Sequence, residues 1–81
     1  MDLLLPGLAQ RLKPLRKEKG HTQKEMADLL GVTERHYQKI EYGKVNVPAL
    51  TLIRLADYFG VSTDYLLGLT DVKKAYPKSK I

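Results

Sequence analysis

The sequence predicts an all-α fold of five short helices in one small domain. Apolar residues recur at helical spacing along the chain, and glycine, which often ends a helix in a left-handed conformation, follows these runs. Residues suited to begin a helix stand before most of the runs. No alternation of apolar and polar residues competes with this pattern, so we expect no strands. Such runs precede five of the six glycines: Gly20, Gly31, Gly43, Gly60 and Gly68.

Length and composition limit the possible classes of protein. The chain has 81 residues, no cysteine and a net charge of +5. A chain this short builds one thin core, and the lack of cysteine excludes disulfides and thiolate metal sites. The basic balance favours a nucleic-acid partner, although a merely basic soluble protein fits the charge equally well. Because neither a membrane span nor a signal peptide is recognisable, we expect a cytoplasmic protein.

The first helix is expected over about residues 8–19 and the second over 23–30. Pro14 lies inside the first helix, where proline removes a backbone hydrogen bond, so this helix either bends there or starts later. Thr22 and Glu25 have the spacing of a capping box that begins the second helix. The second helix has an apolar face formed by Met26, Ala27, Leu29 and Leu30.

The remaining helices are expected over about residues 34–42, 49–59 and 63–67. Thr33 and Ser62 are suited to cap the third and fifth helices. Pro48 suits the first turn of the fourth, where a missing N–H costs nothing. We assign residues 1–70 to a single domain and residues 71–81 to a basic, flexible tail.

The most specific pattern lies between residues 23 and 42. Ala27 is small where the next helix must pass close by, and Gly31 permits the positive φ of a tight turn. Tyr37 and Ile40 are three apart and share a face of the third helix. This spacing is what two short helices need in order to cross at a steep angle.

The same spacing resembles the Cro/cI-type helix-turn-helix family of phage repressors and small bacterial regulators. The resemblance covers roughly residues 8–68 and implies the five-helix fold of lambda-repressor-like DNA-binding domains, with residues 23–42 as the helix-turn-helix unit. It also implies double-stranded DNA as the partner. No cofactor or metal motif is recognisable in the sequence, so we expect neither. The matching positions are Gln23, Ala27, Gly31, Val32, Tyr37, Ile40, Glu41 and Gly43.

A helical wheel divides the third helix into two faces. Thr33, Tyr37 and Ile40 point inward. An α-helix with a polar outer face fits the major groove of B-DNA, where its N-terminal residues meet the base edges. The alternative is an ordinary solvated helix face. The outer side carries Arg35, Gln38, Lys39 and Tyr42, with Glu34 and His36 on the flanks.

Four of these residues are candidates to read bases. Arg35 can bond guanine O6 and N7 together, and Gln38 can read adenine. Glu34 can accept a hydrogen bond from cytosine N4, and Lys39 can reach a guanine or a phosphate. The resemblance likewise implies base contacts by Glu34, Arg35 and Lys39.

Phosphate contacts should fix the docking angle of the third helix. Gln23 opens the second helix, where free backbone N–H groups attract an anion. The resemblance implies that Gln23 bridges a phosphate and the recognition helix. Lys44 and Asn46, in the loop after the third helix, can contact phosphates on the other side of that helix. At the next position after Lys44, where the family commonly has a second basic residue, this chain has Val45. The full candidate set is Thr22, Gln23, His36, Tyr42, Lys44 and Asn46.

Arg16 and Glu41 are expected to form a structural pair. The resemblance implies a salt bridge at these positions that ties the recognition helix to the first helix. Losing one partner of such a pair costs little if it is exposed and more if it is buried.

We expect a homodimer acting as a repressor on a two-fold operator, because one recognition helix reads too few base pairs. Two-fold symmetry would place the half-sites about 34–36 Å apart. A dimer surface is expected on the fourth and fifth helices, with the core as the alternative role, which we favour for Leu66. The dimer candidates are Tyr58, Val61, Tyr65, Leu66 and Leu69, joined by Leu3, Leu4 and Leu5.

Two other classes of function fit the sequence less well. A protein-interaction module, such as an antitoxin, can use the same fold, but its docking face would favour apolar anchors over arginine. An enzyme is disfavoured, because His21 and His36 match no metal or triad signature. The sequence also contains no phosphate-binding glycine loop and no serine in a nucleophile elbow.

Overall fold

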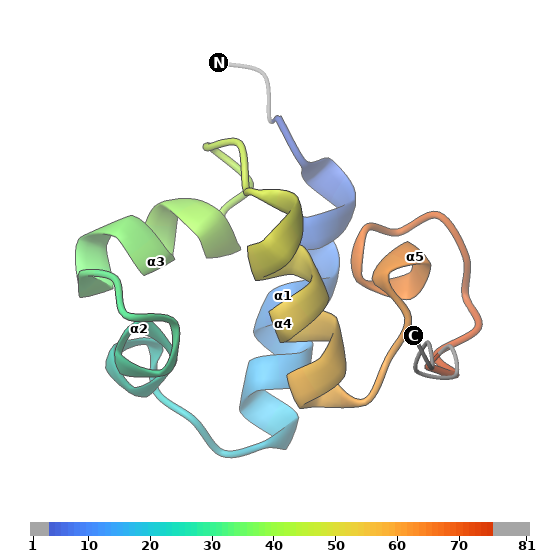
Figure 1. Ribbon diagram of the computed structural model, residues 1–81, viewed down its shortest axis with the longest axis horizontal. Coiled ribbons are helices and arrows are strands. Elements are labelled where there is room, and N and C mark those ends of the chain that lie inside the picture. Colours follow the sequence, from blue (N-terminus) through green and yellow to red (C-terminus); the bar gives the residue numbers. More distant parts are fainter. Residues whose placement is uncertain (1–3, 76–81) are drawn as a thin grey trace.

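The computed structural model describes residues 4–75 of the chain. These residues form five α-helices, in agreement with the predicted all-α class (Figure 1). Within this range, pairing of the β type is limited to one isolated antiparallel bridge between Val61 and Lys74. The helices are α1 (Pro6–Glu18), α2 (Gln23–Leu30), α3 (Glu34–Glu41), α4 (Ala49–Phe59) and α5 (Thr63–Leu66).

The helices are arranged around α1. It packs against α3 on one side and against α5 on the other, while α2 contacts α3 and α4 contacts α5. As a result, α2 and α3 form one side of the molecule, and α5 lies on the opposite side (Figure 1). None of the helices between residues 4 and 75 combines the length and the apolar character that crossing a membrane requires.

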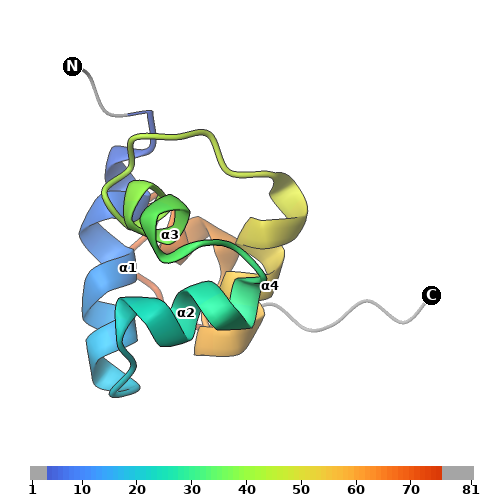
Figure 2. The same ribbon diagram turned by 90° about the vertical axis from the view of Figure 1, so that its left-hand side faces the viewer.

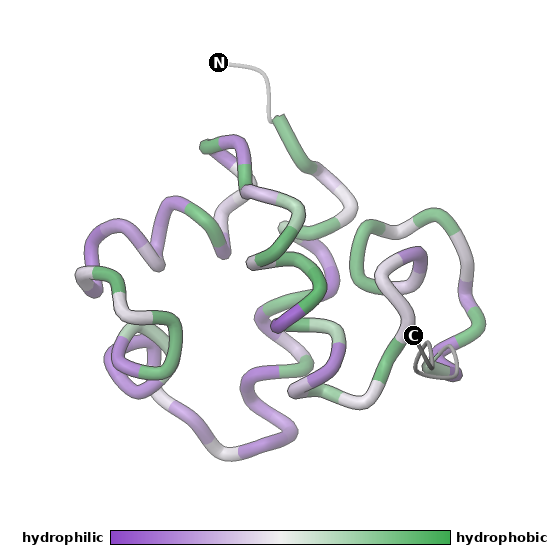
Figure 3. The backbone as a smooth tube through the Cα atoms, viewed as in Figure 1, coloured by the Kyte–Doolittle hydropathy of each residue, from purple (hydrophilic) through white to green (hydrophobic). Residues whose placement is uncertain are grey.

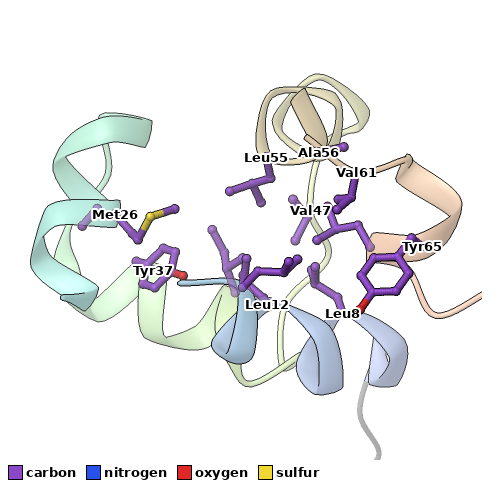
Figure 4. Packing of buried hydrophobic residues seen from close by; sticks show 13 residues of the cluster. Leu8, Leu12, Met26, Tyr37, Val47, Leu55, Ala56, Val61 and Tyr65 are labelled. Carbon is purple, nitrogen blue, oxygen red and sulfur yellow. The ribbon is translucent and has the colours of Figure 1, made fainter. Parts of the chain in front are cut away.

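The core is a single cluster between these helices (Figure 4). Leu8, Leu12 and Leu15 enter it from α1 at helical spacing. Leu29, which was predicted to lie on the apolar face of α2, is instead 42% exposed. The other members of the cluster are Met26, Ala27, Tyr37, Ile40, Val47, Leu55, Ala56, Val61, Tyr65 and Leu66.

The start of α1 differs from the prediction. The helix begins at Pro6 and continues through Pro14, so the alternative of a later start is wrong. Pro6 occupies the first helical turn, where its missing N–H would have no partner within the helix. Pro48 is the N-cap of α4 rather than a residue of its first turn.

The other helix ends lie close to the prediction. The capping box is present, since the Thr22 hydroxyl accepts from the Glu25 N–H and the Glu25 carboxylate accepts from the Thr22 N–H. Thr33 caps α3 through the His36 N–H but is exposed, so its predicted inward orientation is wrong. An N-cap residue has extended rather than helical backbone angles, so a helical wheel does not apply to it. Tyr42 and Leu67 are C-caps that follow the last residues of α3 and α5.

Gly7 lets α1 and the end of α5 approach closely. A Cβ atom at this position would lie 1.8 Å from the carbonyl oxygen of Leu67. Such a contact is far inside van der Waals distance, so no larger residue fits without moving the backbone. The sequence analysis gave Gly7 no role, since it follows no periodic run.

Residues 71–75, the first part of the predicted flexible tail, contact the helices in the structure. The Asp71 carboxylate lies 2.8 Å from the Arg11 guanidinium, and the Ser62 N–H donates to the Lys73 carbonyl. Lys73 also lies over the Tyr65 ring, 5.8 Å from its centroid. This segment therefore packs on α1 and α5, and the rest of the predicted tail lies outside the described residues.

Several candidates for a dimer surface belong to the core. Val61 and Tyr65 are 5% and 9% exposed, so their assignment to a dimer surface is wrong. Leu66 is fully buried, as favoured. Tyr58 is half-buried, and Leu69 is 73% exposed.

The N-terminal leucines divide in a similar way. Leu4 is 59% exposed, whereas Leu5 is half-buried and packs against the core. Leu3 lies outside the described residues. Of these three candidates, Leu4 alone is shown to offer an apolar side chain to solvent.

Candidate nucleic-acid interface

The outer face of α3 is polar and open to solvent. Glu34, Arg35, His36 and Lys39 are exposed, and Gln38 is half-buried. Figure 2 shows α3 and α2 together at the front of the molecule, with α1 and α4 behind them. The α3 segment is also coloured largely as hydrophilic in Figure 3. This face can therefore meet a polar partner without any rearrangement of the described chain.

Two buried side chains hold α3 in this orientation. Tyr37 and Ile40 are 0% and 2% exposed and belong to the core cluster. The Tyr37 ring lies beside Met26 of α2 (Figure 4). Because residues three apart share a helix face, anchoring these two turns the intervening polar residues outward.

Gln23, the first residue of α2, connects α2 to the outer part of α3. Its Nε2 donates to Glu41 Oε2 at 2.6 Å and lies 3.4 Å from the Tyr42 hydroxyl. Its Oε1 accepts from Gln38 Nε2 at 3.2 Å. The beginning of α2 and the exposed face of α3 are thus parts of one continuous surface.

Below this surface lies an ion pair that ties α3 to α1. Arg16 Nε lies 2.6 Å from Glu41 Oε1, and a second guanidinium nitrogen lies 3.3 Å from Oε2. Arg16 also donates to the His21 carbonyl at 2.8 Å, and Tyr37 donates its hydroxyl proton to Glu41 at 3.2 Å. Glu41 is 1% exposed and Arg16 is 8% exposed, so the pair is buried.

The electrostatics of the pair favour the charged forms. Burial alone would raise the pKa of Glu41, but hydrogen bonds from Arg16 and Gln23 outweigh it and lower that pKa below its ordinary value. The hydrogen bond to Glu41 raises the pKa of Arg16. Burial, assisted by the charge of Glu41, raises the pKa of Tyr37. Tyr37 therefore keeps its proton and donates it to the carboxylate.

The turn after α3 is held by the start of the described chain. The backbone N–H groups of Leu4 and Leu5 both lie within hydrogen-bonding distance of the Gly43 carbonyl, at 2.9 and 3.2 Å. Gly43 has φ +70°, and a Cβ atom there would lie 2.7 Å from the Leu5 carbonyl oxygen. Lys44 and Asn46 follow this turn and are exposed. Their position next to the end of α3 is thus fixed by backbone contacts.

The structure brings most of the candidate residues onto one surface, at the start of α2, along α3 and in the following turn. The sequence analysis missed the hydroxyl of Tyr37, which it treated only as an apolar anchor. The four-residue spacing of Tyr37 and Glu41 on one helix was the signal that could have found this contact. Among residues 4–75, no three histidine, aspartate or glutamate side chains gather in a way that could hold a metal ion.

Comparison with known proteins agrees with a helix-turn-helix arrangement of α2 and α3. A family model described as helix-turn-helix matches residues 12–66. The chain is 48% identical over 58 residues to the "SPbeta prophage-derived uncharacterized HTH-type transcriptional regulator YonR" of Bacillus subtilis (strain 168), which covers 72% of this chain and 54% of that protein. It is 39% identical over 68 residues to the "HTH-type transcriptional regulator ImmR" of the same organism, covering 84% and 54% of the two chains.

A relative from a different genus is matched over more of its length. The "Uncharacterized HTH-type transcriptional regulator y4dJ" of Sinorhizobium fredii (strain NBRC 101917 / NGR234) is 39% identical over 57 residues, which cover 70% of this chain and 74% of that protein. The chain spans about half the length of the two Bacillus relatives.

Proposed function

Because the chain belongs to the Cro/cI-type helix-turn-helix family of DNA-binding transcriptional regulators, we propose that it binds operator DNA as a homodimer and acts as a repressor. In this proposal α3 enters the major groove. The observation that carries the proposal is the outer face of α3, which is exposed and polar while its inner face is anchored by Tyr37 and Ile40. An α-helix presented in this way fits the major groove.

Base reading is assigned to Glu34, Arg35, Gln38 and Lys39. Arg35 donates to guanine O6 and N7, a pairing worth roughly 1–3 kcal/mol of discrimination. Lys39, one turn further on, reaches a second guanine or a phosphate. Glu34 accepts from cytosine and disfavours any docking that brings it against the backbone phosphates.

Phosphate contacts are proposed around both ends of α3. The backbone N–H groups of Gln23 and Lys24 begin α2 and have no partner within that helix, so they attract an anion. The Gln23 side chain lies 3.4 Å from the Tyr42 hydroxyl, so the start of α2 is next to the C-terminal end of α3. Contacts near this end are proposed for the exposed side chains of Thr22, Tyr42, Lys44 and Asn46. His36, exposed in the first turn of α3, is proposed to contact a phosphate near the other end.

The proposed dimer uses the surface beyond α5. Leu69 is 73% exposed and Val72 is 63% exposed, so each offers an apolar side chain that the described chain does not cover. Tyr58 contributes at most the exposed part of its ring. Two copies double the number of base pairs read, which a genome-scale search requires. A dimer bound across a promoter then represses by excluding the transcription machinery.

A duplex titration at several salt concentrations tests the proposal. Phosphate contacts release counterions, so log K should fall linearly with log salt. Lys44→Ala should weaken binding to all duplexes alike and reduce the salt slope by about one. Sedimentation of the complex should give two chains per duplex, and Leu69→Ser should weaken this assembly. A binding constant that does not change with salt concentration, or a complex of one chain per duplex, would contradict the proposal.

A further inference from the structure

We propose that Tyr58 is an acylation site, whose hydroxyl takes the acyl group of an uncharged activated ester while His21 accepts the hydroxyl proton. This reaction goes beyond DNA binding and does not depend on it. It uses side chains that the fold brings together beside a hollow between α2 and α4.

Tyr58 and His21 are in direct contact, although they lie 37 positions apart in the sequence. Tyr58 Oη and His21 Nε2 lie within hydrogen-bonding distance, and the centroids of the two rings are 5.7 Å apart. A hydroxyl nucleophile with a base within hydrogen-bonding reach is the pair on which covalent catalysis depends. His21 lies in the turn before α2 and Tyr58 in the last turn of α4, so only the folded chain forms this pair.

Glu25 lies beside the other nitrogen of the His21 ring. Its Oε2 is 3.9 Å from His21 Nδ1, and its Oε1 accepts from the Thr22 N–H at 2.9 Å. A nearby carboxylate favours the neutral imidazole that carries its proton on Nδ1, which leaves Nε2 free to accept the proton of Tyr58. Glu25 is therefore a positioning residue that acts through His21, as the third group does in a nucleophile–base–carboxylate arrangement.

Tyr58 lies within reach of a small molecule. It is half-buried and lines a hollow of about 390 Å³ between α2 and α4. Met26 and Leu29 line the same hollow and provide apolar contacts for the body of an ester. Apolar walls with a few polar groups are typical of the sites that bind small molecules.

The charges around the hollow select an uncharged donor. Glu25 and Asp28 both line it, so their carboxylates repel an anionic donor such as an acyl phosphate. Lys19 Nζ lies 5.2 Å from the centroid of the Tyr58 ring. A cation at this position favours the negative charge that develops on the phenol oxygen during the reaction.

The reaction is an ester exchange. Tyr58 Oη forms a bond to the carbonyl carbon of the donor while its proton passes to His21 Nε2. The bond between that carbon and the leaving oxygen then breaks, and the leaving oxygen takes the proton from His21. The products are an O-acyl tyrosine and a free alcohol or phenol, so no oxidant or further reactant is needed.

The test uses p-nitrophenyl acetate on the full chain, with mass spectrometry of the resulting peptides. A positioned general base contributes at least about 100-fold, so Tyr58 should be acetylated about 100-fold faster than Tyr42. Tyr42 is the matched control, since it is exposed and its described side-chain contact is with Gln23. Hydroxylamine should remove the label, because it cleaves phenyl esters and leaves acetylated lysines intact. Acetyl phosphate at the same concentration should label Tyr58 far more slowly.

Three variants separate the roles of the residues. His21→Gln should slow the acetylation of Tyr58 by about 100-fold and leave that of Tyr42 unchanged. Tyr58→Phe should remove both the label and the fast release of p-nitrophenol. Glu25→Gln keeps the capping contact with Thr22 and should move the ring proton of His21 from Nδ1 to Nε2. Nitrogen NMR of the His21 ring measures this change, which a purely structural role of Glu25 would not produce.

Several results would overturn the inference. Equal labelling of Tyr58 and Tyr42 in wild type would do so without any variant, so the outcome is decided even if His21→Gln does not fold. Fast release of p-nitrophenol by Tyr58→Phe would make His21 the nucleophile, and a wild-type His21 ring with its proton on Nε2 could not accept one from Tyr58. Equal labelling by acetyl phosphate would contradict the choice of an uncharged donor.

Discussion

Replacing Glu41 with glutamine tests the role of the buried ion pair beneath the proposed DNA-binding face. The substitution keeps the size and shape of the side chain and removes its charge. It leaves the Arg16 guanidinium buried without its counterion, because Arg16 is 8% exposed and has its shortest contact, 2.6 Å, with Glu41. It also turns one of the two acceptors into a donor, which would face a donor of Arg16 and, beside it, the donor of either Gln23 or Tyr37.

The expected loss is large for a chain of this size. Removing one partner of a buried ion pair costs about 3–5 kcal/mol. A folded chain of 81 residues has a total stability of about 4–12 kcal/mol. Glu41→Gln should therefore remove a quarter or more of the free energy of unfolding. For a domain in this range the midpoint of thermal unfolding should fall by at least about 12 °C.

Urea unfolding followed by circular dichroism measures the difference, with Asp71→Asn as the control. That variant makes the same change from carboxylate to amide in the Arg11–Asp71 pair, whose aspartate side chain is fully exposed. Exposed pairs are weakened by solvent, so its unfolding midpoint should stay close to that of wild type. Equal midpoints for Glu41→Gln and Asp71→Asn would refute the reasoning.

Two further predictions concern stability. The pKa of Glu41 lies below its ordinary value of 4.5. The ionised carboxylate therefore contributes fully to the free energy of unfolding above pH 4.5, and this contribution is lost as the pH falls through the lowered pKa of the folded state. Between about pH 6 and pH 3, wild type should therefore lose more stability than Glu41→Gln, as equilibrium urea unfolding at each pH would show; parallel profiles would contradict this. Gly7→Ala should lower the midpoint of thermal unfolding, because the new Cβ would lie 1.8 Å from the Leu67 carbonyl oxygen. The expected loss of stability is about 1–3 kcal/mol. A midpoint equal to that of wild type would show that α1 and α5 can move apart at no cost.

Local signals were enough to place the helices. The capping residues Thr22, Thr33 and Ser62 and the left-handed glycines act within one turn of the chain, so their effect can be read from adjacent residues. For Pro14, by contrast, a local signal was insufficient, since it left open a later start of the first helix that the structure does not show. Pro14 weakens its own turn of α1, but the leucines that this helix buries keep the helix continuous.

The polar network and the burial of Val61 and Tyr65 depend on contacts between residues that are distant in the sequence. Val61 and Tyr65 were dimer candidates as apolar residues of the fourth and fifth helices, with the core as the alternative role, and they are buried in the folded chain. The link from Gln38 through Gln23 to Glu41 joins residues up to 18 positions apart. Spacing can predict that Gln38 lies on the outer face of α3, but not which way its amide is turned.

The claim that α3 reads base edges is tested most directly by measuring how Arg35→Ala changes discrimination at single base pairs. The affinities of wild type and variant would be compared on a selected duplex and on a series in which each base pair is exchanged in turn. If α3 reads base edges, the variant should lose roughly 1–3 kcal/mol of discrimination at one G·C pair per half-site and little elsewhere. An equal loss at every position, or none at the G·C pairs, would contradict it.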